Sequence, residues 1–153
     1  MVNDPLESLF PLLSDAGYSV TSPATPEYNC VAWAMNNDER WWWPDPMEEY
    51  YWPEKASREA TLASFNQTFT TFGFEICADE QLEQGYEKVA IFVDGSGEPT
   101  HLARQLSNGR WTSKLGSSVD IEHSLQGLTS SEYGSVGQIL RRRVSDPTSP
   151  KYL

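Results

Sequence analysis

The sequence predicts a single α+β domain in which N-terminal helices pack on a mostly antiparallel sheet. Two observations lead to this fold class. The helix-like patterns all precede residue 73 and the strand-like patterns all follow it. The length of 153 residues is also that of one domain. We expect the domain to cover residues 1–145 and a flexible tail to cover 146–153, where two prolines occur.

The first thirty residues predict short helices separated by a loop. Residues 5–16 carry apolar side chains at near-helical spacing, but Pro11 interrupts them, which predicts a kinked helix or two short turns. Residues 18–27 contain two prolines and are expected to form an extended loop. Asn29 is a good N-cap, so Cys30 should open a short apolar helix.

An aromatic segment, RWWWPDPMEEYYWP, occupies residues 40–53. Its prolines argue against regular structure, so we expect a long loop held in place by buried aromatic rings. Residues 57–72 then predict a helix that ends at Gly73.

The second half predicts a meander of strands. Asn108-Gly109 between two strand-like runs is typical of a hairpin with a two-residue turn. The predicted strands are 74–77, 88–93, the two arms of the hairpin at 100–107 and 110–115, and 135–144.

Composition excludes several classes of partner. Eleven Lys and Arg against 22 Asp and Glu give a formal charge of −11, which repels nucleic acid phosphates and anionic lipids. No apolar run approaches the roughly 20 residues that cross a bilayer, and no signal peptide is recognisable. We therefore expect a cytoplasmic protein with no nucleic acid or membrane partner, and with neither a metal nor a cofactor.

Cys30 is the first candidate for chemistry. The chain has two cysteines, Cys30 and Cys77, too few for a zinc site, and we expect both to be free thiols in a reducing compartment. A thiol in the first turn of a helix meets unpaired N–H groups that favour the thiolate, as a nucleophile requires. The alternative is that Cys30 packs as a small hydrophobic residue.

His101 is the second candidate. It is one of two histidines, with His123, and it stands at the start of the best-defined predicted strand. Imidazole exchanges a proton near neutral pH, so His101 could act as the base for Cys30 within hydrogen-bond reach. The alternative is an ordinary core or surface histidine.

The order of these elements resembles the papain-like fold, in particular the bacterial NlpC/P60 and CHAP amidases. Asn29-Cys30-Val31-Ala32 resembles their Asp-Cys-Ser-Gly motif, and HLARQLSNGRWTS, from His101 to Ser113, resembles their histidine strand, hairpin and third polar residue. The resemblance covers about residues 28–116. It implies an NlpC/P60-like fold in which Cys30 attacks, His101 transfers the proton and Ser113 is the third catalytic residue.

The third position departs from that pattern. Ser113 carries no charge, and a two-residue turn would place it on the opposite face from His101 unless a bulge intervened. Gln105, Thr112 and Asp120 are the alternatives. The sequence HLARQLSNGRWTSKLG with a later IEH also resembles an uncharacterised bacterial family without an established activity.

These observations predict a cysteine-dependent amide or ester hydrolase or acyltransferase. The Cys30 N–H, helped by Tyr28 or Asn29, would bind the oxyanion of a peptide, amide or other acyl substrate. Three consecutive tryptophan side chains diverge, so one of residues 41–43, such as Trp43, should border the groove while the others anchor the loop. The alternative is a non-catalytic acidic module, immunity-like, that binds a basic protein.

Overall fold

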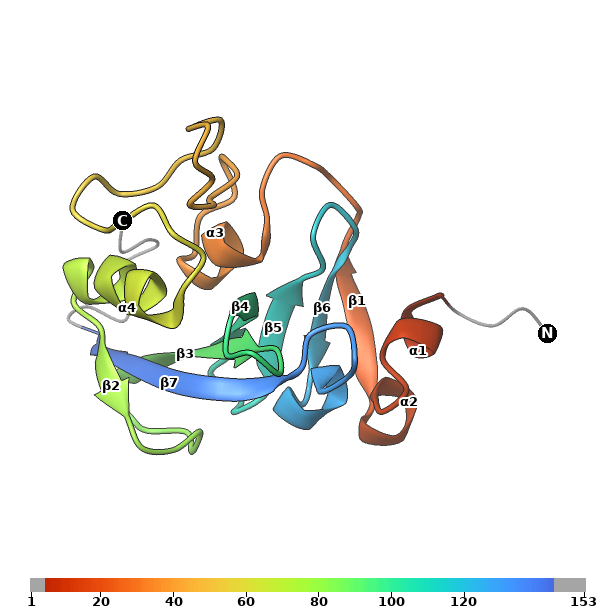
Figure 1. Cartoon of the computed structure of the whole chain (residues 1–153). Helices are drawn as coiled ribbons and strands as arrows, with labels where there is room; N and C mark the ends of the chain where they lie inside the picture. Colours follow the sequence, from red (N-terminus) through yellow and green to blue (C-terminus); the bar gives the residue numbers. More distant parts are fainter. Residues whose placement is uncertain (1–4, 145–153) are drawn as a thin grey trace.

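The computed structural model describes residues 5–144, and a seven-stranded sheet dominates it (Figure 1). The strand order is β1-β6-β5-β4-β3-β7-β2, and all neighbouring strands are antiparallel. The strands are β1 (Tyr18–Ser22), β2 (Glu75–Cys77), β3 (Tyr86–Val93), β4 (Pro99–Gln105), β5 (Trp111–Lys114), β6 (Asp120–His123) and β7 (Ser135–Arg143).

The helices are short. The longest has ten residues, and the others amount to little more than a turn each. They are α1 (Pro5–Leu9), α2 (Leu13–Ala16), α3 (Cys30–Ala34), α4 (Leu62–Thr71) and the 3₁₀ helix η1 (Leu125–Leu128). Within residues 5–144, none of them has both the length and the apolar character that a bilayer crossing requires.

The predicted fold class is therefore wrong. The chain is mainly an antiparallel sheet with few short helices, and it does not form the papain-like, NlpC/P60-like arrangement of helices on a sheet. Residues 5–16 break into two short helices around Pro11, and part of the expected loop, Tyr18–Ser22, becomes an edge strand paired with β6. The predicted tail at 146–153 lies outside the described residues.

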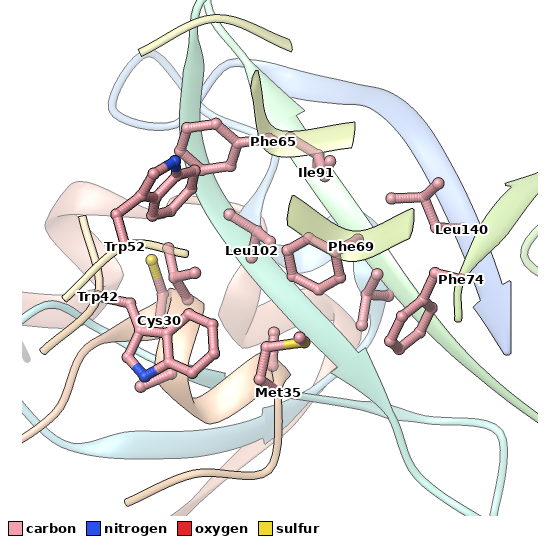
Figure 2. Close-up of a cluster of buried hydrophobic side chains, with 14 of the residues drawn as sticks. Cys30, Met35, Trp42, Trp52, Phe65, Phe69, Phe74, Ile91, Leu102 and Leu140 are labelled. Atoms are coloured by element: carbon pink, nitrogen blue, oxygen red, sulfur yellow. The ribbon is translucent and has the colours of Figure 1, made fainter. Parts of the chain in front are cut away.

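Two hydrophobic cores cover the two faces of the sheet. Alternation along β3 sends Val89 and Ile91 to the first core and Ala90 and Phe92 to the second. The first core also receives α3, α4 and the aromatic segment, and Figure 2 shows Cys30 in it beside aromatic and aliphatic side chains. The second core is closed by α2 and η1. The candidate site thus lies on a sheet that is buried on both faces.

The aromatic segment is an ordered loop, as its composition predicts. A parallel bridge pairs Trp42 with Tyr51, and the Trp43 N–H donates to the Tyr51 carbonyl at 3.0 Å. Arg58 holds the loop by donating hydrogen bonds to both the carbonyl and the carboxylate of Asp45. The loop therefore presents its rings at fixed positions.

The β4–β5 hairpin has a longer turn than predicted. The Leu106 N–H donates to the Arg110 carbonyl at 2.7 Å, so three residues connect the strands, and Gly109 adopts φ +88°. Gln105 consequently pairs with Trp111 instead of Thr112. This shift by one residue places Ser113 on the face of His101 and sends Lys114 to the α3 side.

Candidate active site

A pocket of about 400 Å³ contains both principal candidates, Cys30 and His101. It lies where α3 begins above the first residues of β4, and the aromatic segment forms its outer wall. The lining residues are Asn29, Cys30, Trp41, Trp43, Tyr50, Thr100, His101, Gly116 and Tyr133.

Asn29 fixes the start of α3 and the aromatic wall at once. Its Oδ1 accepts from the Ala32 N–H at 3.3 Å, as the predicted N-cap. The same amide clamps the backbone of Trp42, accepting from its N–H at 3.1 Å and donating to its carbonyl at 2.7 Å. The side chain thereby holds Cys30 and the tryptophan loop in one arrangement.

Cys30 lies at a place where the sheet opens. Between β4 and β5 the ladder includes Arg104 with Thr112 and Gln105 with Trp111, but no pairs nearer the start of β4. The backbone N–H of Leu102 instead acts on the Cys30 sulfur and favours its thiolate form. The sulfur therefore lies at the edge of β4.

Burial keeps this thiol protonated. It raises the pKa of Cys30 to about 11, although the backbone N–H groups of Leu102 and Val31 and the charge of Lys114 act in the opposite direction. The resting site thus holds a neutral thiol at neutral pH. Cys30 and Cys77 are both free.

His101 is buried, with 1% of its surface exposed, and neither ring nitrogen has a hydrogen-bond partner. The imidazole stacks on Tyr133 with the ring centroids 4.1 Å apart and meets the edge of Phe92. Burial, reinforced by His123, holds the pKa of His101 well below its usual range. The expected hydrogen bond between His101 and Cys30 is not formed.

Alternation along β4 places Leu102 on the α3 side and His101 on the other side of the sheet. Cys30 and His101 nevertheless line one pocket. They can do so because β4 and β5 separate at this end, and no paired strand divides the two sides there.

The outer wall of the pocket is aromatic. Trp41 and Trp43 line it from the loop, together with Tyr50, whose ring lies 5.9 Å from that of Trp41. Trp42, between them, is 1% exposed and belongs to the first core. Divergence of consecutive side chains thus distributes the three tryptophans between the pocket and the core, but two of them line the pocket where the sequence predicted one.

Ser113 does not contact His101. Its hydroxyl hydrogen-bonds Nε2 of His123 at 2.7 Å, and Nδ1 of His123 bonds the Ser124 carbonyl at 2.6 Å. Both side chains are fully buried outside the pocket. This arrangement satisfies the polar atoms of β5 and β6, and it leaves His101 without Ser113 as an orienting group.

The alternative third residues are also engaged elsewhere. Gln105 donates to the Glu80 and Gly109 carbonyls, and the Thr112 hydroxyl accepts from the Trp33 indole. Asp120 accepts from the phenol of Tyr28 at 3.1 Å. Burial, reinforced by this hydrogen bond, raises the pKa of Tyr28 to about 12. Tyr28 itself does not line the pocket.

Sequence reasoning missed the residues that come from distant segments. Tyr133 reaches the site from the loop before β7, and Lys114 is fully buried and donates to the carbonyl of Gly116, a pocket residue. No local pattern marks Tyr133, whereas Lys114 belongs to the SKLG motif. Among residues 5–144, no three His, Cys, Asp or Glu side chains gather in a way that could hold a metal ion.

Removing the Asn29 amide is expected to loosen the site. Asn29→Ala loses the cap and both bonds to Trp42, so the free energy of unfolding should fall by about 2–3 kcal/mol. Asn29→Asp keeps the acceptor but turns the donor into a second oxygen facing the Trp42 carbonyl, and it should also destabilise. Urea unfolding measures both. Equal stability of Asn29→Ala and wild type would show that the clamp is unimportant.

Comparison with known proteins identifies one family and no characterised relative. No curated protein and no solved structure matches the chain. The family described as "Domain of unknown function (DUF7689)" matches residues 19–141, which include every residue of the pocket. The chain belongs to this family of unknown function.

Proposed function

We propose that the protein is a cysteine-dependent hydrolase or acyltransferase acting on an amide or ester, with Cys30 as nucleophile and His101 as general base. One observation carries the proposal. A thiol and a buried imidazole line the same pocket, and both nitrogens of that imidazole lack a partner.

An unpartnered buried polar group costs about 1–3 kcal/mol, so its retention needs a reason. A substrate group or the thiol proton of Cys30 would give the nitrogens of His101 hydrogen-bond partners. The neutral imidazole that burial enforces is also the form that can accept a proton.

The reaction would begin from a neutral pair. As the Cys30 sulfur attacks the carbonyl carbon, the thiol proton moves to an imidazole nitrogen and the carbonyl electrons move to oxygen. The tetrahedral intermediate collapses when the imidazolium protonates the departing amine or alcohol, which leaves a thioester on Cys30. Water, deprotonated by His101, then releases the acid, or a second nucleophile takes the acyl group.

The pocket walls indicate the kind of acyl group. Trp41, Trp43 and Tyr50 offer flat apolar surfaces, which suit an aromatic or aliphatic side chain next to the reacting carbonyl. The charge of −11 favours neutral or basic substrates over anionic ones. A peptide or related amide with an apolar side chain satisfies both conditions.

A chromogenic ester and intact-mass spectrometry test the proposal. Aryl acyl esters should release phenol and leave one acyl group on Cys30. Cys30→Ala should abolish the adduct, and His101→Gln should slow acylation about 100-fold or more, whereas Cys77→Ala should change neither. An adduct on Cys77 alone, or unaltered turnover in folded Cys30→Ala, would overturn the assignment.

A non-covalent binding module is the second candidate, favoured by the aromatic wall and by the protonated state of Cys30. A basic partner would insert an apolar side chain between Trp41 and Trp43. In that case no ester forms an adduct, Cys30→Ala binds the partner normally, and Trp43→Ala weakens binding.

A further inference from the structure

Lys114 is an ammonium buried without a salt bridge. Its side chain has no exposed surface, and Nζ donates to the carbonyls of Thr25 at 2.7 Å and Gly116 at 2.6 Å. Among the described residues, no carboxylate oxygen lies within 4.0 Å of this nitrogen. Lysines are almost never fully buried unless they are paired, because desolvation of the charge costs several kcal/mol.

Lys114 lies close to the pocket. The carbonyl that accepts from Nζ belongs to Gly116, which is a pocket residue. Nζ also lies 4.9 Å from the centre of the ring of Tyr28, a residue that precedes Cys30 by two positions. Helix α3 packs against β5, which carries Lys114. Burial lowers the pKa of Lys114, against the charges of Asp120 and Cys30, and the charge of Lys114 in turn acts to lower the pKa of Cys30.

One acidic group, Asp120, acts on Lys114 and pairs with it across the β5–β6 ladder. Its two carboxylate oxygens, however, accept from Thr21 and Tyr28. The other titratable groups that line the pocket with Cys30 are His101, Tyr133 and Tyr50, and burial favours the neutral form of the first two. Lys114 is therefore the group that supplies positive charge to the thiol.

We infer that Lys114 is the electrostatic partner of Cys30. Its ammonium stabilises negative charge on the sulfur when the thiol ionises. A second role rests on the proposed function: the ammonium also stabilises the oxyanion of an acyl group held beside Cys30. Lys114 need not touch the substrate, because a fixed charge in a water-poor site acts across several ångströms.

Alkylation of Cys30 by iodoacetamide tests the inference without any substrate. A Cys77→Ser background leaves one thiol, and the rate is followed against pH. Lys114→Met keeps the volume of the side chain, whereas Lys114→Gln keeps an NH₂ group for two carbonyls; both remove the charge. Each should lower the rate about tenfold at pH 8 and shift the profile by about one unit to higher pH.

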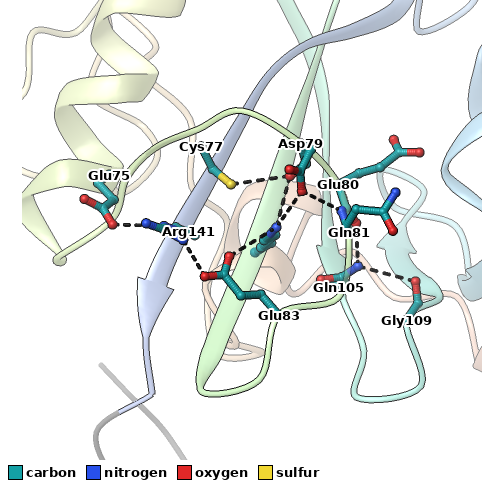
Figure 3. Close-up of polar contacts among 10 residues, drawn as sticks. Glu75, Cys77, Asp79, Glu80, Gln81, Glu83, Gln105, Gly109 and Arg141 are labelled. Atoms are coloured by element: carbon teal, nitrogen blue, oxygen red, sulfur yellow. Dashed lines mark hydrogen bonds and ion pairs between the residues drawn. The ribbon is translucent and has the colours of Figure 1, made fainter.

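Lys88→Met is the matched control. Lys88 is the other buried lysine among residues 5–144, but its Nζ bonds Asp79 at 3.2 Å in the ion-pair cluster around Glu83 and Arg141 (Figure 3). Lys88→Met should leave the dependence of the Cys30 alkylation rate on pH unchanged. An unchanged profile in either folded Lys114 variant would overturn the inference.

If neither Lys114 variant folds, wild type decides the question. The ratio of the alkylation rate with anionic iodoacetate to that with neutral iodoacetamide is measured at Cys30. It should be higher in the folded protein than in the urea-unfolded chain, because a nearby cation attracts the anion. An equal or lower ratio would refute the role of Lys114. The alkylation results do not depend on ester turnover, so the inference and the proposed function can fail separately.

Discussion

Trp42→Ala is expected to lower the free energy of unfolding by about 3–5 kcal/mol, because it removes a large buried side chain. Trp42 meets Tyr51 edge-on at 4.6 Å between centroids and Phe72 at 5.8 Å. Its indole N–H has no partner, so no hydrogen bond is lost with it. Urea unfolding followed by circular dichroism measures the change.

Trp41→Ala is the matched control from the same run of residues. Trp41 is half-buried on the pocket wall, so its loss should cost about 1 kcal/mol or less. It should instead weaken ligand binding or change the reactivity of Cys30. Equal destabilisation by the two substitutions would contradict the division of this loop between core and pocket.

Acidification from pH 7.5 to pH 4.5 should strongly destabilise the fold. Burial lowers the pKa of His123 to about 4 and that of His101 well below its usual range, whereas both titrate near 6.5 when unfolded. The unfolded chain therefore binds more protons between these values, and stability is lost as the pH falls through 6.5. His123 alone should contribute about 2.5 kcal/mol at pH 4.5.

Urea titrations at the two pH values measure this loss, and His123→Gln should remove part of it. Hydrogen bonds lower the pKa of Asp94, and backbone hydrogen bonds with nearby cations lower the pKa values of Asp45 and Asp79. Their contributions disappear only below about pH 4, the ordinary aspartate value, so they do not enter this window. Equal stability at pH 7.5 and 4.5 would mean that the histidines are accessible to protons in the folded state.

Local signals in the sequence succeeded where one residue decides the structure. Asn29 caps α3 and Cys30 opens it, as predicted from residue type alone. The apolar run in β3 and the hairpin after His101 were recognisable for the same reason. The length of the hairpin turn was not, because Asn-Gly suits both two-residue and three-residue connections.

The fold class required information that short segments do not carry. Strands β1 and β6 are four or five residues long and largely polar, and they become strands by pairing with each other across about 100 positions of sequence. Without them the chain resembles helices followed by a small sheet. Tertiary pairing, which local propensity does not encode, decided the outcome.

The site was predictable in part. Cys30, His101 and the tryptophan run could be selected by chemistry and composition. Lys114 could not, because the ordinary expectation for a lysine is exposure, and its burial depends on the register of β5.

The number of residues in the turn between β4 and β5 decides which side chains of β5 face Cys30. With one residue fewer between Leu106 and Arg110, alternation along β5 would turn Ser113 toward α3 and Lys114 toward the second core. An insertion or deletion there could thus remove the cation beside Cys30 while leaving every letter of the SKLG motif intact. When family members are aligned, the spacing of this hairpin therefore carries as much information about the site as the identity of its residues.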